Sequence, residues 1–574
     1  MRRILLFWTA LAVLLTACSS EPKASQSDAP SAPGEPANIY GRGASGKRGV
    51  VASAKPEASQ VGIDILKAGG NAVDAAVATG FAIGVVEPNT SGLGGGGFMI
   101  IKLVDMPEPV VIDFRETAPA AAKPDMFTDA AGEVIPQSSV IGGLASGVPG
   151  DVAGLLYALE NYGSKKISRQ QILEPSIKLA ENGYVVTQNL FGIITDNLAN
   201  INKYPATAQI YTEDGLPPEV GSIIKNPDLG ASLRLVAQGG RDAFYKGEMA
   251  QKIAKAVQDA GGILTAEDLA NYKAEARKPV SGTYRDYTII SVPPASSGGT
   301  HIIQILNMLE NMDMSKAVPG SAEGVHAWAQ ALRLAFADRG KYMADSAFTS
   351  VPLAGLTSKD YAKQLFAKFD PNKAMASADA GDPTKFESGS TTSISVMDKD
   401  GNMVAITKSI NYFFGSAVVV PGTGIIMNNH MDDFVLRPGH IQSVEPGKRP
   451  LSSMSPSLVL DPSGAPFMTL GSPGATRIIA AVAEVISNVI DHGMPIQNAI
   501  VAPRYFAMAS GQVHVEGRIP EETVTGLKNL GYDVNVHSNW DAYFGGVQGI
   551  VFDRKTKTLH GGGDPRRDGE ARAY

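Results

Sequence analysis

Cysteine is almost missing from this chain of 574 residues, in which Cys18 is the only one. A disulfide within one chain is therefore excluded. Basic residues are fewer than acidic ones, so the formal net charge is -7 and the pI is about 5.7. A chain with this charge has no excess of basic residues with which to bind nucleic acid. After the first 17 residues the chain also has no apolar run long enough to span a membrane.

The first residues predict export from the cytoplasm. Two arginines precede an apolar run, residues 4–15, that is too short to span a bilayer, as in a secretory signal. The run closes on Leu-Thr-Ala-Cys at residues 15–18, which resembles a bacterial lipobox. We therefore expect residues 1–17 to be removed and the sulfur of Cys18 to be lipidated. The alternative is a plain signal peptide with a chance cysteine.

Ser19 follows the expected lipid attachment site. By resemblance to lipoproteins without an acidic residue at this position, Ser19 implies a periplasmic protein anchored to the outer membrane, with the lipid as its only membrane contact. Residues 18–47 are rich in Ser, Pro, Ala and Gly and show no apolar period, which predicts a flexible tether. Residues 41–47 imitate the spacing of a phosphate loop. No strand precedes them and Arg48 stands where Ser or Thr would bind magnesium, so we reject that interpretation.

Helical and strand patterns alternate from residue 48 onward. Residues 56–68 and 72–86 carry apolar side chains at helical spacing, and the second segment is apolar enough to be buried on most sides. A glycine run at residues 91–97 precedes an apolar strand instead of following one, so it predicts close backbone approach and not a dinucleotide loop. A strand at residues 110–114 ends at Arg115, whose guanidinium is either a surface group or a clamp for a carboxylate.

The junction at residues 389–396 is the stretch around which the chain is organised. A Gly- and Ser-rich segment stops there, and residues 391–398 alternate small or polar with apolar side chains, as in a half-buried strand. A turn and a returning strand at residues 403–406 follow. If the bond before Thr391 were cut, its free amine, with a pKa of about 7.7 to 8, would take the proton from its own hydroxyl. An ordinary loop-to-strand transition is the competing interpretation.

Polar groups gather at the ends of the strands that follow this junction. Ser409 and Asn411 close the returning strand, and residues 428–434 carry Asn, His and Asp side chains after the next one. Residues 450–456 contribute several serines. The turn at residues 471–476 is Gly-rich and opens an amphipathic helix, so its unpaired backbone N–H groups suit an anion or an oxyanion.

Five segments, taken in this order, resemble the gamma-glutamyltranspeptidases, bacterial members of the N-terminal-nucleophile hydrolases. They are DFRE at Asp113, TTSISVMDKDGN at Thr391, NNHMDDF at Asn428, RPLSSMSP at Arg449 and GSPGATRI at Gly471. The similarity runs from about residue 48 to the C-terminus. It implies an α+β fold, a four-layer αββα sandwich, that is made as an inactive precursor. Self-cleavage between Ser390 and Thr391 would leave a heterodimer of a large subunit, residues 48–390, and a small subunit, residues 391–574, in one globular body.

The resemblance also implies roles for single residues, without a metal or an organic cofactor. The catalytic set comprises Thr391 as the nucleophile, the supporting hydroxyl of Ser409, and the backbone N–H groups of Gly474 and Ala475 as the oxyanion hole. The substrate-binding set comprises Arg115, Ser452 and Ser453 for the α-carboxylate, and Asp433, Asn411 and the neighbouring His430 for the α-ammonium. Glutathione or another gamma-glutamyl donor would acylate Thr391, and water or an amino-acid or peptide acceptor would take the glutamyl group in a ping-pong course.

Three departures from the family pattern give further expectations. His430 replaces the usual glutamine or glutamate, and its charging predicts that the KM for glutathione rises as the pH falls through about 6.5. Ser409 in place of threonine and Ala475 in place of glycine are expected to have mild effects. Residues 436–449 are too few for the lid loop of some relatives, so the site is expected to be open to bulky gamma-glutamyl compounds.

Two other functions stay open on the sequence. A cephalosporin (glutaryl) acylase of the same fold would take donors without the α-ammonium, against which the retention of Asp433 argues. An uncleaved lipoprotein that only binds gamma-glutamyl ligands would run as one band on a denaturing gel, whereas the enzyme would run as two.

Overall fold

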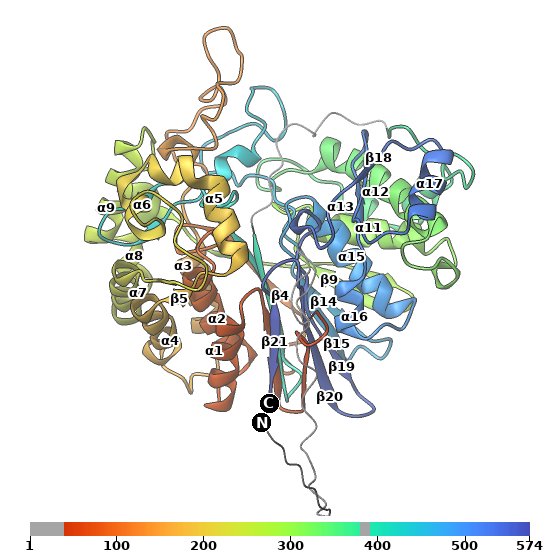
Figure 1. The fold of residues 1–574 in the computed structure, drawn as a ribbon, viewed down its shortest axis with the longest axis horizontal. Helices are drawn as coiled ribbons and strands as arrows, with labels where there is room; N and C mark the ends of the chain where they lie inside the picture. Colours follow the sequence, from red (N-terminus) through yellow and green to blue (C-terminus); the bar gives the residue numbers. More distant parts are fainter. Residues whose placement is uncertain (1–38, 379–390) are drawn as a thin grey trace, which may run out of the picture.

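The computed structural model describes residues 39–378 and 391–574 (Figure 1). The expected signal peptide, Cys18 and Ser390 lie outside these residues. Two stacked β-sheets occupy the centre, with a layer of helices on either side. This is the expected four-layer arrangement. Within the described residues, no helix has the length and apolarity of a membrane span.

Each central sheet has seven strands and is antiparallel throughout. The first sheet runs in the order β21 (Glu570–Ala573), β2 (Gly49–Ser53), β10 (Thr392–Asp398), β11 (Met403–Ser409), β3 (Gly96–Lys102), β4 (Val110–Phe114) and β7 (Glu275–Arg277). The second sheet runs in the order β1 (Ala44–Gly46), β20 (Thr558–Gly563), β19 (Gln548–Asp553), β15 (Pro466–Gly471), β14 (Ser457–Leu460), β9 (Tyr287–Ser291) and β8 (Val280–Tyr284).

The helices divide between the two outer layers in chain order. The first sheet is covered by α1 (Pro56–Lys67), α2 (Ala72–Val86), α3 (Asp151–Tyr162), α4 (Arg169–Asn182), α5 (Gln188–Asn202), α6 (Pro205–Tyr211), α7 (Pro227–Gly239), α8 (Arg241–Tyr245), α9 (Gly247–Asp259) and α10 (Ala266–Asn271). The second sheet is covered by α11 (Gly298–Leu309), α12 (Ala322–Tyr342), α13 (Leu353–Leu356), α14 (Lys359–Phe366), α15 (Arg477–Ile490), α16 (Ile496–Val501) and α17 (Glu521–Asn529).

Three small sheets lie outside the central pair. They are formed by β5 (Tyr184–Val185) with β6 (Ile223–Ile224), β12 (Val419–Val420) with β13 (Ile425–Ile426), and β16 (Tyr505–Ala507) with β17 (Val513–Val515) and β18 (Val534–Val536).

Strand β10 shows how its alternating sequence builds two interfaces. Ile394 and Val396 belong to the core beneath α2 and its neighbouring helices. Ser395 points the other way, and its hydroxyl donates to the backbone oxygen of Gln548 in the second sheet, 3.0 Å away. The period-2 pattern therefore places one face on the helices and the other on the second sheet.

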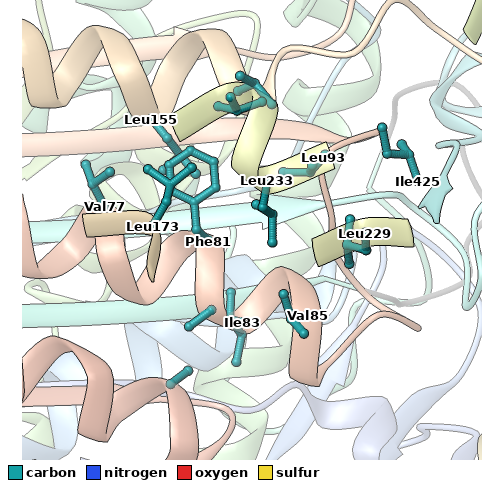
Figure 2. Packing of buried hydrophobic residues seen from close by; sticks show 14 of the residues in the cluster. Val77, Phe81, Ile83, Val85, Leu93, Leu155, Leu173, Leu229, Leu233 and Ile425 are labelled. Atoms are coloured by element: carbon teal, nitrogen blue, oxygen red, sulfur yellow. The ribbon is translucent and has the colours of Figure 1, made fainter. Parts of the chain in front are cut away.

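Helix α2 is the central element of the outer layer that covers β10. All of its residues are buried, as its apolar sequence predicts. Figure 2 shows Val77 and Phe81 of this helix beside Leu155 of α3 and Leu173 of α4. The carboxylate of Asp398, at the end of β10, accepts the first N–H of the helix at 3.0 Å. An acidic group at a helix N-terminus is stabilising, so this bond fixes β10 against α2.

The glycine run before β3 serves close packing, as its sequence predicts. A Cβ atom added to Gly95 would lie 2.2 Å from the backbone oxygen of Ser409, and one added to Gly97 would lie 2.3 Å from that of Thr407. Only glycine permits this approach of β3 to β11.

The expected tether, residues 18–47, is too long at its C-terminal end. Ala44–Gly46 forms β1, which pairs with β20 at the edge of the second sheet. The edge strand offers free backbone groups, and these pair with the small residues of β1 although that segment has no apolar period. The folded body therefore begins before residue 48.

Candidate active site

Thr391 lies at the N-terminal end of the central strand β10 of the first sheet. Its neighbours on either side are β2 and β11, so the strand is held by two ladders. The Thr391 hydroxyl donates to the hydroxyl oxygen of Ser409, the last residue of β11, at 3.3 Å. The same Ser409 oxygen accepts the backbone N–H of Asn411 at 2.7 Å. The structure thus brings together three residues of the expected site, Thr391, Ser409 and Asn411.

Arg115 follows β4 and is completely buried. Its guanidinium donates to the carboxylate of Asp433 and, through Nε, to the backbone oxygen of Pro450 at 3.3 Å. Its own backbone oxygen accepts the Tyr272 hydroxyl at 2.9 Å and Nη1 of Arg449 at 3.1 Å. The surface interpretation of Arg115 is therefore wrong, and the side chain is pre-positioned by its neighbours.

Asp433 ends a short 3₁₀ helix, η3 (His430–Asp433), and its side chain keeps 26% exposure whereas that of Arg115 has none. The Arg115 guanidinium and the Asp433 carboxylate thus form an ion pair, in which Asp433 is the partner that solvent can reach. Asn411 is linked to the start of η3, because its Nδ2 donates to the backbone oxygen of Asn429 at 3.2 Å. Asn411 has a φ of 74°, a left-handed conformation that asparagine tolerates better than most residues.

Ser452 and Ser453 follow Pro450, which Arg115 contacts, after one intervening residue. The Ser452 backbone N–H donates to Ala295 at 2.9 Å, and its hydroxyl oxygen accepts the N–H of Met454 at 3.0 Å. The two serines are therefore held on an extended segment beside the Arg115–Asp433 pair.

The turn between β15 and α15 begins against β10. A Cβ atom added to Gly471 would lie 2.3 Å from the hydroxyl oxygen of Ser393, so the turn starts on the strand that carries Thr391. Gly474 and Ala475 have φ values of 128° and 49°. Their carbonyls accept the first N–H groups of the helix, and their own N–H groups donate to no described residue. Two unpaired donors at a helix N-terminus suit a developing oxyanion.

Glu116 lies in the site, between Arg115 and His430, although the sequence indicates no role for it. Its carboxylate is fully buried, 3.5 Å from Nη1 of Arg115 and 2.9 Å from Nδ1 of His430. Burial raises the pKa of Glu116 to about 7, although Arg115 opposes the shift. Its position in the DFRE segment was the only signal in the sequence, and nothing there indicated that it faces His430.

The expected charging of His430 near pH 6.5 is contradicted by its surroundings. Burial, and after it the positive charge of Arg115, lowers the pKa of His430 well below its usual range, and Asp433 only partly compensates. The imidazole is therefore neutral throughout the range in which an exposed histidine titrates. It does not repel an ammonium group at pH 6.5.

We expect Glu116, and not His430, to govern binding near neutral pH. Above a pH of about 7 its carboxylate is ionised and attracts a substrate ammonium, so the KM should rise as the pH falls through 7. His430→Gln should leave that profile in place, whereas Glu116→Gln should flatten it. The measurement is the KM for a gamma-glutamyl anilide between pH 5.5 and 8.5. A profile that flattens in His430→Gln alone would return the effect to the histidine.

The comparisons with known proteins agree with this geometry. Residues 58–574 match the family described as Gamma-glutamyltranspeptidase. The chain belongs to the gamma-glutamyltranspeptidase family. It is 42% identical over 534 residues to a glutathione hydrolase proenzyme of Escherichia coli (strain K12), which covers 91% of this chain and 90% of the relative.

Acylases are also among the proteins to which this chain is similar. The chain is 41% identical over 535 residues to the Acylase ACY 1 proenzyme of Pseudomonas sp. (strain SE83), covering 92% of this chain and 93% of the relative. The crystal structure of a cephalosporin acylase from Bacillus halodurans superposes with a TM-score of 0.85 at 29% identity, over 97% of this chain and 99% of that one. The four layers are those of an N-terminal-nucleophile hydrolase.

Proposed function

We propose that the chain cuts itself before Thr391 and then transfers gamma-glutamyl groups from glutathione and related donors through that threonine. The observation that carries this proposal is the Thr391–Ser409 hydrogen bond at the tip of β10, which Asn411 connects to the segment that bears the Arg115–Asp433 pair. It supplies a hydroxyl on a rigid strand and two opposite charges for an amino-acid end.

Cleavage follows from the position of Thr391. Its hydroxyl oxygen attacks the carbonyl carbon of Ser390, the C–N bond breaks, and the nitrogen of Thr391 leaves as a free amine. Water then hydrolyses the ester, which gives Ser390 a carboxyl end and restores the Thr391 hydroxyl. The new amine has a pKa of about 7.7 to 8 in the unperturbed state and accepts the hydroxyl proton in later turnovers.

Donor binding uses both charges of the amino-acid end. The Arg115 fork and the Ser452 and Ser453 hydroxyls receive the α-carboxylate, and Asp433 with Asn411 receives the α-ammonium. The gamma-carbonyl then lies over Thr391. Its hydroxyl oxygen attacks, the N–H groups of Gly474 and Ala475 stabilise the oxyanion, and the protonated amine leaves. Water or the amine of an amino acid or peptide attacks the resulting ester, which releases the glutamyl group.

The second candidate is deacylation of glutaryl amides, which the similarity to acylases favours. Glutaryl donors lack the α-ammonium that Asp433 would bind. We expect L-gamma-glutamyl-p-nitroanilide to exceed glutaryl-p-nitroanilide by about a hundredfold in kcat/KM, because the charge-assisted bonds between Asp433 and the ammonium, worth about 2 to 3 kcal/mol, would be lost. Hydrolysis of both at equal rates would favour the acylase, and binding without hydrolysis by a single uncut chain would favour the ligand-binding alternative.

The short connection between η3 and Ser452 bears on donor size. Val435 and Ser443 pair in an isolated β-bridge, which closes this segment into a short loop. Residues 436–449 form no helix and no strand. We expect gamma-glutamyl oligomers to be hydrolysed with a kcat/KM within about tenfold of that for glutathione, because no lid must be displaced. Release of glutamate from a defined gamma-glutamyl pentamer measures this. Negligible release beside rapid glutathione hydrolysis would contradict the open site.

Location in the cell is proposed from the N-terminal sequence alone. The lipobox-like segment before Cys18 supports removal of residues 1–17, lipidation, and attachment to the periplasmic side of the outer membrane. Labelled palmitate should enter the wild-type protein and not Cys18→Ser, and the variant should become soluble in the periplasm. Equal fractionation of both proteins would point to a plain signal peptide.

A further inference from the structure

Arg339 lies in the last turn of α12, and its side chain contacts the segment of the site that carries Ser452 and Ser453, here called the serine segment. Its Nε donates to the hydroxyl oxygen of Ser297 at 2.9 Å, and its Nη2 donates to that of Ser453 at 3.1 Å. The planar guanidinium therefore spans two hydroxyls with donors of fixed geometry.

Ser297 links Arg339 to Ser452 through hydrogen bonds. It is fully buried, and both its hydroxyl and its backbone N–H donate to the backbone oxygen of Ser452, each at 2.8 Å. Arg339 thus fixes the serine segment at two points. One is the Ser453 hydroxyl itself, and the other is the Ser452 carbonyl by way of Ser297.

These bonds decide where the serine protons point. A serine hydroxyl has one proton to donate. The Ser453 oxygen accepts from Arg339, and the Ser452 oxygen accepts from the Met454 N–H at 3.0 Å. No described residue accepts a proton from either hydroxyl, so both protons are available to an acceptor that enters the site. A carboxylate is the acceptor that two hydroxyl donors suit best.

Carboxylates around Arg115 partly offset its positive charge. Arg115 donates to the Asp433 carboxylate and lies 3.5 Å from that of Glu116. A donor carboxylate that approaches Arg115 therefore meets a guanidinium that is already paired with carboxylates. The nearby Arg449 is likewise paired, with Asp113 and Glu275. The guanidinium of Arg339, which donates to the Ser453 hydroxyl, adds positive charge on the serine side of the site.

We propose that Arg339 is a positioning residue that makes the site select donors with an α-carboxylate. It orients the Ser453 hydroxyl proton toward that carboxylate and adds positive charge beside it. The inference rests on the proposed function, because it concerns how the same donor is recognised.

Two substrates isolate the carboxylate. L-gamma-glutamyl-p-nitroanilide carries it, and 4-aminobutyryl-p-nitroanilide has the same ammonium and amide without it. Arg339→Met should raise the KM for the first by about ten- to a hundredfold, as expected for loss of hydrogen bonding to a charged group, with kcat little changed. The KM for the second should stay the same. Arg339→Lys keeps the charge but not the fork, so its effect should be intermediate.

A double-mutant cycle separates positioning from general damage. In a Ser453→Ala background the effect of Arg339→Met should shrink, because the partner it orients is gone. Arg333→Lys is the matched control: this arginine lies on the same helix, and its bonds go to the backbone oxygens of Ala376 and Gly511. It should alter neither substrate's KM.

Several outcomes would overturn the role of Arg339. Equal losses on the two substrates, or the same factor with and without the Ser453 hydroxyl, would show that it acts only through the fold. If Arg339→Met does not fold, Arg339→Lys decides, and wild-type selectivity in that variant would overturn the proposal. A wild-type protein without activity on the glutamyl anilide would instead overturn the proposed function itself.

Discussion

A Thr391→Ala protein is expected to stay a single full-length chain and to lose its activity on gamma-glutamyl amides by roughly a thousandfold or more, as when a nucleophile is removed. The reason is that one hydroxyl performs both the cleavage and the transfer. It lies at the tip of β10 and donates to Ser409 at 3.3 Å. Denaturing electrophoresis and anilide hydrolysis, measured on the same preparation, test both losses.

Thr391→Ser and Thr392→Ala are the matched variants for this experiment. Serine keeps the hydroxyl and should still yield two chains, although more slowly. Thr392 is the next residue along β10 and is buried, but its side chain points to the opposite face of the sheet. Its alanine variant should therefore be cut. Normal cleavage in Thr391→Ala would contradict the account of this hydroxyl.

Replacing Arg115 by lysine should lower kcat/KM for a gamma-glutamyl donor by about a hundred- to several-thousandfold, because disrupting a buried charge pair costs about 3 to 5 kcal/mol. Lysine retains the charge but cannot contact Asp433, Pro450 and a carboxylate in one plane. Most of the loss should appear in KM. Steady-state kinetics of the processed heterodimer measure it.

Arg234→Lys is the control for that loss. Arg234 also pairs with a carboxylate, that of Glu181, but on the exposed surface between α7 and α4. Exposed pairs contribute little, so this variant should match the wild type. An Arg115→Lys protein that is fully processed and binds the donor as well as Arg234→Lys does would rule out the carboxylate clamp.

Local pattern was enough to predict the elements that carry the site. The alternation after Thr391 predicts β10, and the apolar sequence of residues 72–86 predicts the buried helix α2 with its observed bounds. Both signals are periodic and lie within one stretch of chain. The regular pattern of the returning strand was predicted over residues 403–406, with Ser409 and Asn411 at its close, and β11 runs to Ser409. Its polar end is buried against β10 and β3, which no local pattern reports.

What the sequence could not predict is which distant side chains face each other. Glu116 and His430 meet across more than 300 residues, and their mutual burial shifts both pKa values in ways that an exposed residue would not show. Arg339 resembles any other arginine near the end of a helix until the fold brings it to Ser453. The edge strand β1 likewise depends on β20, which lies at the other end of the chain. These features belong to tertiary contacts and not to periodicity.

The measurement that tests the central claim most directly is the location of the glutamyl group during turnover. Purified protein would be mixed with a gamma-glutamyl donor, quenched in acid within the first turnover, and its small chain sequenced by mass spectrometry. We predict a chain that begins at Thr391 and carries one glutamyl group on that residue. A glutamyl group on Ser409 or on any other residue, or none at all during active turnover, would contradict the account.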